Sequence, residues 1–243
     1  MFYTPGNLGF SDTTSLSINA NIYGLENINT QNYLGQRTDL KGLQFNTIPL
    51  PVSGSLQTKS DWNISYGLLS PVSFNFSGVA RVVREFHIAG EEVSPGKEEV
   101  VSESGIITKV QETRVALGVD KMLNSNPGFG ISVWNTIRTV NYSYRFSAKA
   151  LTNNPDQLLI ARIQNEFINY FALGTALKFG LNYQNESYGL GVAVTTPELD
   201  WIGNGTVAKE LTLANLNIPG TDESLTAYAS DRQEKLKPLV NHL

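Results

Sequence analysis

The sequence contains no cysteine and only two histidines among its 243 residues. Without cysteine, a disulfide framework and a thiolate metal site are both excluded. His87 and His242 lie far apart along the chain, and neither belongs to a cluster with the spacing of metal ligands. We therefore expect no cofactor and no metal centre.

Charged residues and long apolar runs are also scarce. Charged side chains make up 16% of the chain and the net charge is -4, a balance that does not suggest a nucleic-acid partner. No apolar run reaches the roughly 18–20 residues of a transmembrane helix. A membrane β-barrel stays possible, because each of its strands needs only about 9–11 residues.

Motifs of catalysis and nucleotide binding are missing as well. Gly189-Leu190-Gly191 lies inside a strand pattern and does not precede a helix, and Gly203–Thr206 lacks the rest of a phosphate loop. Glu91-Glu92 and Glu98-Glu99 could bind a divalent cation, but a solvated acidic loop is the simpler interpretation. The sequence indicates that the protein is not an enzyme.

The stretch from Trp62 to Val82 shows the strongest pattern. Its apolar side chains share one parity, which predicts a long strand with one apolar face: Trp62, Ile64, Tyr66, Leu68, Val72, Phe74, Phe76, Ala80 and Val82. Ser70-Pro71 interrupts this run, and proline in a strand indicates an edge, a bulge or a turn. A two-residue hairpin would switch the apolar parity, so the unchanged parity favours one kinked strand over a hairpin.

Further strands are expected over residues 14–23, 43–58, 105–121, 129–150, 171–183 and 188–194. Within 129–150 the apolar parity shifts to Tyr142, Tyr144 and Phe146, which predicts a bulge. Loops are expected over 25–41 and 89–104, and the pattern loosens beyond Pro197. A short helix is expected over 155–165, where Leu159, Ile163 and Phe167 follow a possible N-cap at helical spacing.

Short turns near residues 60, 125 and 185 alternate with long polar segments at 25–41, 89–104, 151–165 and beyond 197. Outer-membrane barrels have short periplasmic turns and long outer loops, so we expect the long segments outside the cell. Aromatic residues near the strand ends would supply interfacial girdles, although aromatics are common in any strand. The pattern favours an all-β, antiparallel up-and-down transmembrane β-barrel, with Leu173, Leu177, Phe179 and Leu181 facing lipid and Lys178 facing the interior.

The order of segments resembles the outer-membrane long-chain fatty-acid transporter family, most closely its Bacteroidetes-type versions. Thr4–Gly9 resembles the Asn-Pro-Ala-type motif before the first strand of that family, although Thr4 replaces the usual Asn and Asn7 replaces a small residue. The other stretches that carry the resemblance are Ile48–Gly54, Leu68–Phe76, Val194–Pro197, Gly203–Gly205 and Ala229–Lys237.

This resemblance implies a monomeric 14-stranded barrel in the outer membrane of a Gram-negative cell, plugged by an N-terminal hatch. Hydrophobic compounds such as fatty acids would diffuse in from outside and leave sideways into the membrane beside a kinked third strand. The expected substrate path includes Pro5, Leu8 and Phe10 in the hatch-like segment 1–13, and Gly67, Ser70, Pro71 and Gly78 in the kinked strand.

Residues 14–243 would then form a single, partial barrel domain of about seven strands, in a fragment that lacks the signal peptide and the closing strands. An open sheet in lipid leaves unpaired edges, which is why closing strands are expected. The alternative is a soluble or surface-attached β-sandwich that acts as an adhesin or structural protein.

Overall fold

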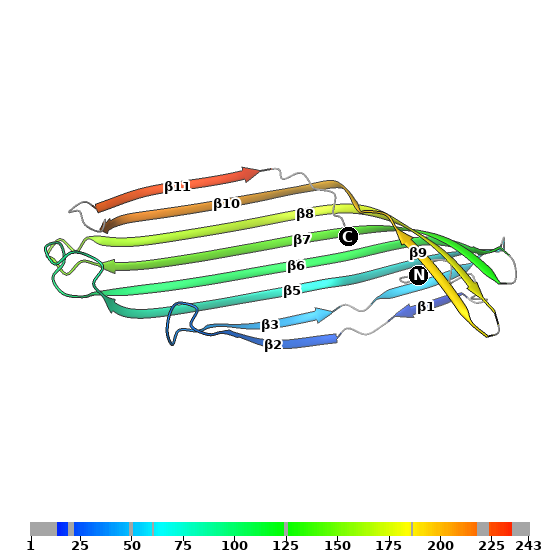
Figure 1. Ribbon diagram of the computed structural model, residues 1–243, viewed down its shortest axis with the longest axis horizontal. Coiled ribbons are helices and arrows are strands. Elements are labelled where there is room, and N and C mark those ends of the chain that lie inside the picture. Colours follow the sequence, from blue (N-terminus) through cyan, green and yellow to red (C-terminus); the bar gives the residue numbers. More distant parts are fainter. Residues whose placement is uncertain are drawn as a thin grey trace.

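The computed structural model describes residues 14–18, 22–48, 51–59, 61–123, 126–185, 187–217 and 224–234. The regular secondary structure of this part of the chain is all β, with eleven strands in one antiparallel sheet (Figure 1). It contains no helix long and apolar enough to cross a membrane. The predicted hatch-like segment, with Pro5, Leu8 and Phe10, lies outside the described residues.

The four central strands have 25 or 26 residues each, which is more than twice the length of every other strand except the one spanning Leu199–Asn217. In chain order the strands are β1 (Ser15–Ile18), β2 (Ile22–Thr30), β3 (Leu40–Ile48), β4 (Val52–Gln57), β5 (Trp62–Phe86), β6 (Glu98–Met122), β7 (Pro127–Leu151), β8 (Leu159–Gln184), β9 (Gly189–Thr195), β10 (Leu199–Asn217) and β11 (Ser224–Glu234).

Neighbours in the sheet follow the chain, so the topology is up-and-down. Strands β1 and β2 pair with β4 and β3 in one unchanged register, so the four strands form a single interrupted hairpin. Strands β9 and β10 follow one another along the same edge of β8, and β11 pairs with β10. The predicted all-β, antiparallel up-and-down architecture is confirmed, but the described sheet is open, with β1 and β2 at one edge and β9 and β11 at the other.

The connections differ in length at the two ends of the sheet. Strands β4 and β5, β6 and β7, and β8 and β9 are joined by short connections at one end (Figure 1). The connections at residues 31–39, 87–97 and 152–158 are longer and lie toward the opposite end. This arrangement agrees with the predicted alternation of short turns and long loops.

Several predicted boundaries are wrong. The helix predicted over 155–165 is absent, because Leu159, Ile163 and Phe167 belong to β8. Side chains four residues apart share a face in a strand as well as in a helix, so their spacing does not distinguish the two. The predicted loop 25–41 contains most of β2, the predicted strand 43–58 is divided between β3 and β4, and β10 and β11 lie beyond Pro197.

Strand β5 is one continuous strand with a bulge, so the prediction of a kinked strand is confirmed and the hairpin is wrong. Leu69 pairs with Arg114 but Val72 pairs with Glu112, so Ser70 and Pro71 lie opposite Thr113 alone. One extra residue moves every following side chain to the other face. The predicted single apolar face is therefore wrong, since Trp62–Leu68 and Val72–Val82 direct their even-numbered side chains to opposite faces.

The bulge predicted in residues 129–150 is also wrong. Strand β7 keeps one register against both β6 and β8 along its whole length. Tyr142, Tyr144 and Phe146 consequently lie on the face opposite to Ile131 and Val133. In β7 the apolar residues change face while the backbone stays regular.

Candidate functional site

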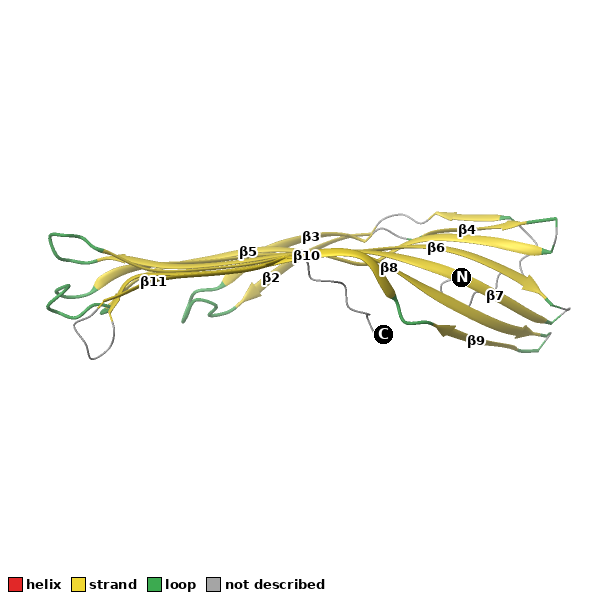
Figure 2. Ribbon diagram, turned by 90° about the horizontal axis from the view of Figure 1, so that it is seen from above, coloured by secondary structure: helices red, strands yellow, loops and turns green. Residues whose placement is uncertain are grey.

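The half of the sheet near the short turns has two distinct faces. One face, here called the inner face, buries small and polar side chains, among them Asn63, Ser65, Ala116, Ser132 and Ala176. The opposite, outer face carries exposed apolar side chains, here called the outer band: Leu56, Trp62, Ile64, Leu68, Val115, Leu117, Val119, Val133, Ile137, Leu177, Phe179, Leu181, Leu190, Val192 and Val194. In Figure 2 the strands fan apart in this half and form a thin layer in the other.

The height of the outer band along the sheet follows from the length of strand that it covers. From Phe129 to Ile137 the strand rises over eight residue steps by about 27 Å, or by about 21 Å when tilted by about 40°. Lys178 lies on the inner face, with its Nζ atom 5.9 Å from the centroid of the Trp134 ring. The prediction that Lys178 lies on the face of the sheet opposite to Leu177, Phe179 and Leu181 is therefore confirmed.

In the half of the sheet away from the short turns, the inner face is apolar and aromatic. Phe74, Val110, Val140 and Tyr170 form one cross-strand row from β5 to β8, and Phe76, Thr108, Tyr142 and Ile168 form the next. Directly paired side chains on one face lie about 4.5–5.5 Å apart, so each row is a continuous surface. We call these two rows the aromatic tract.

A cluster of charged residues lies on the inner face between the aromatic tract and the short-turn half. The Glu112 carboxylate accepts hydrogen bonds from Arg114 Nε at 2.7 Å and from Arg138 Nε and Nη2 at 3.0 and 2.8 Å. Asp200 and Glu198 lie over Gly174, where an added Cβ would meet their oxygens at 2.3 and 2.5 Å. An adjoining pocket of about 340 Å³ is lined by Arg114, Trp134, Thr136, Ala176, Lys178, Thr195 and Glu198.

The ladder between β5 and the β3–β4 line is interrupted. Strand β4 pairs with β5 as far as Val52 and Leu68, and pairing resumes at Gly42–Gly78 and Lys41–Val79. Residues 69–77 of β5 have no ladder pair among the described residues of β3 and β4. The register is the same on both sides of this interruption, which we call the slit, and the β5 bulge lies within it.

Four of the predicted site residues lie along this edge of β5. Gly67 pairs with Ser53 just beyond the end of the slit that is nearer the short turns. Gly78 pairs with Gly42 at the opposite end of the slit, which we call its upper end. Between them, Ser70 Oγ lies 3.5 Å from Thr113 Oγ1, and Pro71 is exposed. Both paired glycines are required by packing, because a Cβ at Gly42 or Gly78 would lie 2.2 or 2.8 Å from the Phe76 ring.

The sequence reading missed the aromatic tract and the charged cluster. The change of parity at Tyr142 is the sequence signal for the aromatic tract, because β7 keeps its register there and the apolar side chains change face. The sequence carries no signal for the charged cluster, because Glu112 and Arg138 lie on neighbouring strands, Glu198 lies just before β10, and the folded sheet brings them together.

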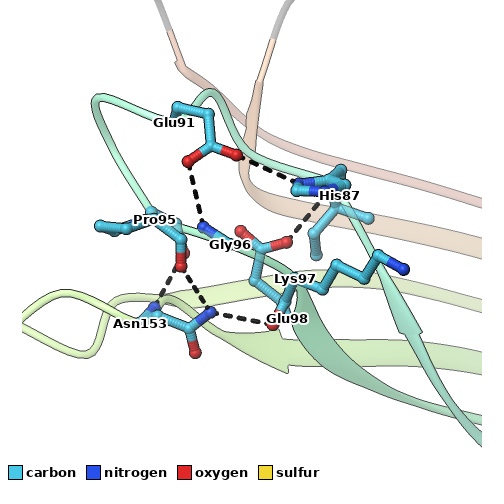
Figure 3. A network of polar contacts seen from close by, with 9 residues as sticks. His87, Glu91, Pro95, Gly96, Lys97, Glu98 and Asn153 are labelled. Carbon is cyan, nitrogen blue, oxygen red and sulfur yellow. Dashed lines mark hydrogen bonds and ion pairs between the residues drawn. The ribbon is translucent and has the colours of Figure 1, made fainter.

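The acidic loop at 87–97 is fastened to the neighbouring loop at 152–158 (Figure 3). Asn153 Nδ2 donates to the carbonyls of Pro95 and Lys97 at 3.1 and 2.9 Å, and its backbone N–H donates to Ser94 Oγ at 2.8 Å. Glu98 is fully buried and accepts a hydrogen bond from the Ile88 backbone N–H at 3.0 Å. The described residues contain no group of acidic or histidine side chains that could hold a metal ion.

No protein-family model, curated protein or solved structure is significantly similar to this chain. The class of protein that the fold defines is a long-stranded, open antiparallel sheet whose apolar surface changes face partway along its strands. The resemblance to fatty-acid transporters stays a prediction.

Proposed function

We propose that the protein carries hydrophobic small molecules, such as long-chain fatty acids, through the outer membrane of a Gram-negative cell. The outer band supports this proposal, because monomeric soluble proteins rarely expose so large a contiguous apolar surface. Its height also suits the roughly 25 Å apolar band of an outer-membrane barrel. In lipid the open edges at β1, β2, β9 and β11 would need strand partners, so we propose that the sheet forms part of a closed barrel.

The observation that carries the proposal is the meeting of two apolar surfaces at the slit. Val72 and Phe74 follow the bulge on the inner face, whereas Leu68 precedes it on the outer face, and all three are exposed. An apolar molecule on the aromatic tract would meet paired charges at Glu112 and Arg138 if it continued along the inner face. Through the slit it would meet the outer band, and so it would leave sideways into the lipid.

Pro71 has a direct role in this route. Proline lacks a backbone N–H, so a ladder hydrogen bond cannot form at that position. An unpaired backbone group in lipid costs several kcal/mol. An open ladder is therefore disfavoured unless water, the transported molecule or another segment of the protein covers the unpaired groups. The competing explanation is a bulge that only adjusts the curvature of the sheet. Passage into lipid needs no energy source, because it removes apolar surface from water.

The test replaces Pro71 with valine in a host that lacks its own fatty-acid transporter. Pro71→Val restores an N–H and favours pairing across the slit, so we expect reduced uptake of radiolabelled oleate at an unchanged amount of folded protein in the outer membrane. Pro95→Val changes an exposed proline in the loop at 87–97 and serves as the control. Undiminished uptake in Pro71→Val at equal abundance would remove Pro71 from the route.

A soluble β-sandwich with an adhesive or structural role is the competing class. A sandwich covers the apolar face of one sheet with a second sheet. The described strands all belong to one sheet, and the outer band stays exposed. A monomer that stays in solution without detergent would favour the sandwich over the barrel.

A further inference from the structure

The tip of the β2–β3 hairpin covers part of the inner apolar surface. Ile28, Tyr33 and Leu34 pack with Ile106 against a buried core of Leu40, Phe76 and Ala80. Phe76 belongs to the aromatic tract, and Ile106 lies on the same face one row further from the slit. The hairpin tip therefore occupies apolar surface that an entering hydrophobic molecule would contact.

Apart from this apolar packing, two side chains of the sheet, Ser104 and Arg84, hold the tip by hydrogen bonds. Ser104 Oγ donates to the Tyr33 hydroxyl at 3.4 Å, and Arg84 Nη2 donates to Thr38 Oγ1 at 3.2 Å and to the Gln36 carbonyl. Only two residue pairs join β3 to β5, at Lys41–Val79 and Gly42–Gly78. By contrast, β5 pairs with β6 from Trp62 to Phe86, interrupted only by the bulge.

The tip is braced internally, so it can move as one unit. Asn32 Oδ1 accepts a hydrogen bond from the Arg37 backbone N–H at 2.7 Å, and Asp39 Oδ1 accepts one from the Asn32 N–H at 3.1 Å. The Thr38 N–H donates to the Gly35 carbonyl at 3.1 Å. These bonds lie within residues 32–39 and do not depend on contact with the sheet.

We propose, on the basis of the transport function above, that residues 31–42 form a latch that closes the upper end of the slit and shields the aromatic tract. With the latch closed, Tyr33 and Leu34 pack against the cluster that contains Phe76, Gly42 lies against the Phe76 ring, and the pairs at Lys41 and Gly42 end the slit. Release of the latch uncovers Phe76 and lengthens the slit, so that a hydrophobic molecule reaches both together. Arg84 and Tyr33 hold the closed state.

A reversible cross-link tests the latch. The chain has no cysteine, so the pair Lys41→Cys and Val79→Cys supplies the only thiols. Paired residues of antiparallel strands have Cα atoms about 4.5–5.5 Å apart, which suits a disulfide. The control, Arg81→Cys with Glu103→Cys, joins the exposed β5–β6 pair beside the latch, where no movement is proposed.

Oleate uptake is measured in the transporter-deficient host with each pair oxidised and then reduced, and cross-linking is quantified by mass spectrometry. We expect the oxidised latch pair to fall to the host background, reduction to restore uptake, and the control pair to transport in both states. Equal uptake by the oxidised and reduced latch pair would overturn the latch and leave the proposed function standing. Wild-type uptake no greater than that of the host would overturn the proposed function itself.

Arg84→Ala tests the latch in the opposite direction without a cross-link. Loss of the two hydrogen bonds to the tip favours the open state, so we expect faster oleate uptake than in the wild type. Arg81→Ala, at an exposed position of the same strand, is the control. Unchanged or slower uptake in Arg84→Ala at equal abundance would contradict the role of Arg84 in holding the tip.

Discussion

At the scale of single residues, Glu98 is buried at the far end of the sheet, outside the outer band, where the loop at 87–97 returns to β6. Burial opposes its ionisation, but hydrogen bonds from the Ile88 backbone N–H, the Ser94 hydroxyl and nearby backbone groups outweigh this effect and lower its pKa. The carboxylate form therefore stabilises the folded loop. Its contribution is complete above the ordinary glutamate pKa of about 4.3 and is lost as the pH falls through the lowered value.

We expect the loop at 87–97 to loosen in acid for this reason. A spin label at Val93→Cys, an exposed position in a chain without cysteine, should become more mobile below about pH 4.3, the ordinary glutamate pKa. In Glu98→Gln the label should already be mobile at pH 7 and respond little to acid, whereas Glu99→Gln, at an exposed neighbour, should behave as the wild type. A wild-type acid response in Glu98→Gln would exclude Glu98 as its source.

At the scale of elements, the long strands combine two surfaces of different character. In β8, Leu177 and Phe179 belong to the exposed outer band, whereas Lys178 and Ala176 lie on the inner face beside Trp134. In the other half of the same strand, Tyr170 and Ile168 bring the apolar character to the inner face. One strand thus serves both the proposed lipid contact and the proposed substrate contact.

A pair of substitutions in β8 tests the facing of the outer band. A cationic side chain on the lipid face costs about 2–4 kcal/mol near the middle of the bilayer. Leu177→Arg should therefore lower the free energy of unfolding in lipid vesicles by about that amount, and Lys178→Leu should lower it less. Equal effects, or a larger effect of Lys178→Leu in urea titrations, would argue that this face does not contact lipid.

At the scale of the whole molecule, the sheet separates its short connections from its long loops. Asn153 and Asn154 fasten the two long loops at 87–97 and 152–158 to each other. Asn154 Nδ2 donates a hydrogen bond to the Val93 carbonyl at 2.9 Å. Outer-membrane barrels place such loops outside the cell. The long-loop end should accordingly face the medium, and the short turns the periplasm.

Cysteine labelling on intact cells tests this orientation. Val93 and Leu123 are both exposed and lie at opposite ends of the long strands. A membrane-impermeant maleimide should label Val93→Cys on intact cells, and Leu123→Cys only after the outer membrane is permeabilised. If Leu123→Cys is labelled on intact cells and Val93→Cys is not, the proposed orientation is wrong and the short turns face the medium.

The sequence by itself determined the all-β class, the kink at Ser70-Pro71 and the alternation of short and long connections. Each of these depends on local chemistry, namely side-chain alternation, the missing N–H of proline and the turn residues between strands. The facing of Leu177 against Lys178 was predictable for the same reason, because neighbours in a strand point to opposite faces.

Only the tertiary structure decided which face each apolar residue occupies beyond the bulge. Phe74 keeps the parity of Leu68 in the sequence, but one extra residue in the ladder places it on the opposite face. The meeting of Glu112 with Arg138 and the packing of Tyr33 against the cluster that contains Phe76 were likewise decided by strand register and by packing across the sheet. Register depends on the partner strand, and one strand's own sequence does not contain it.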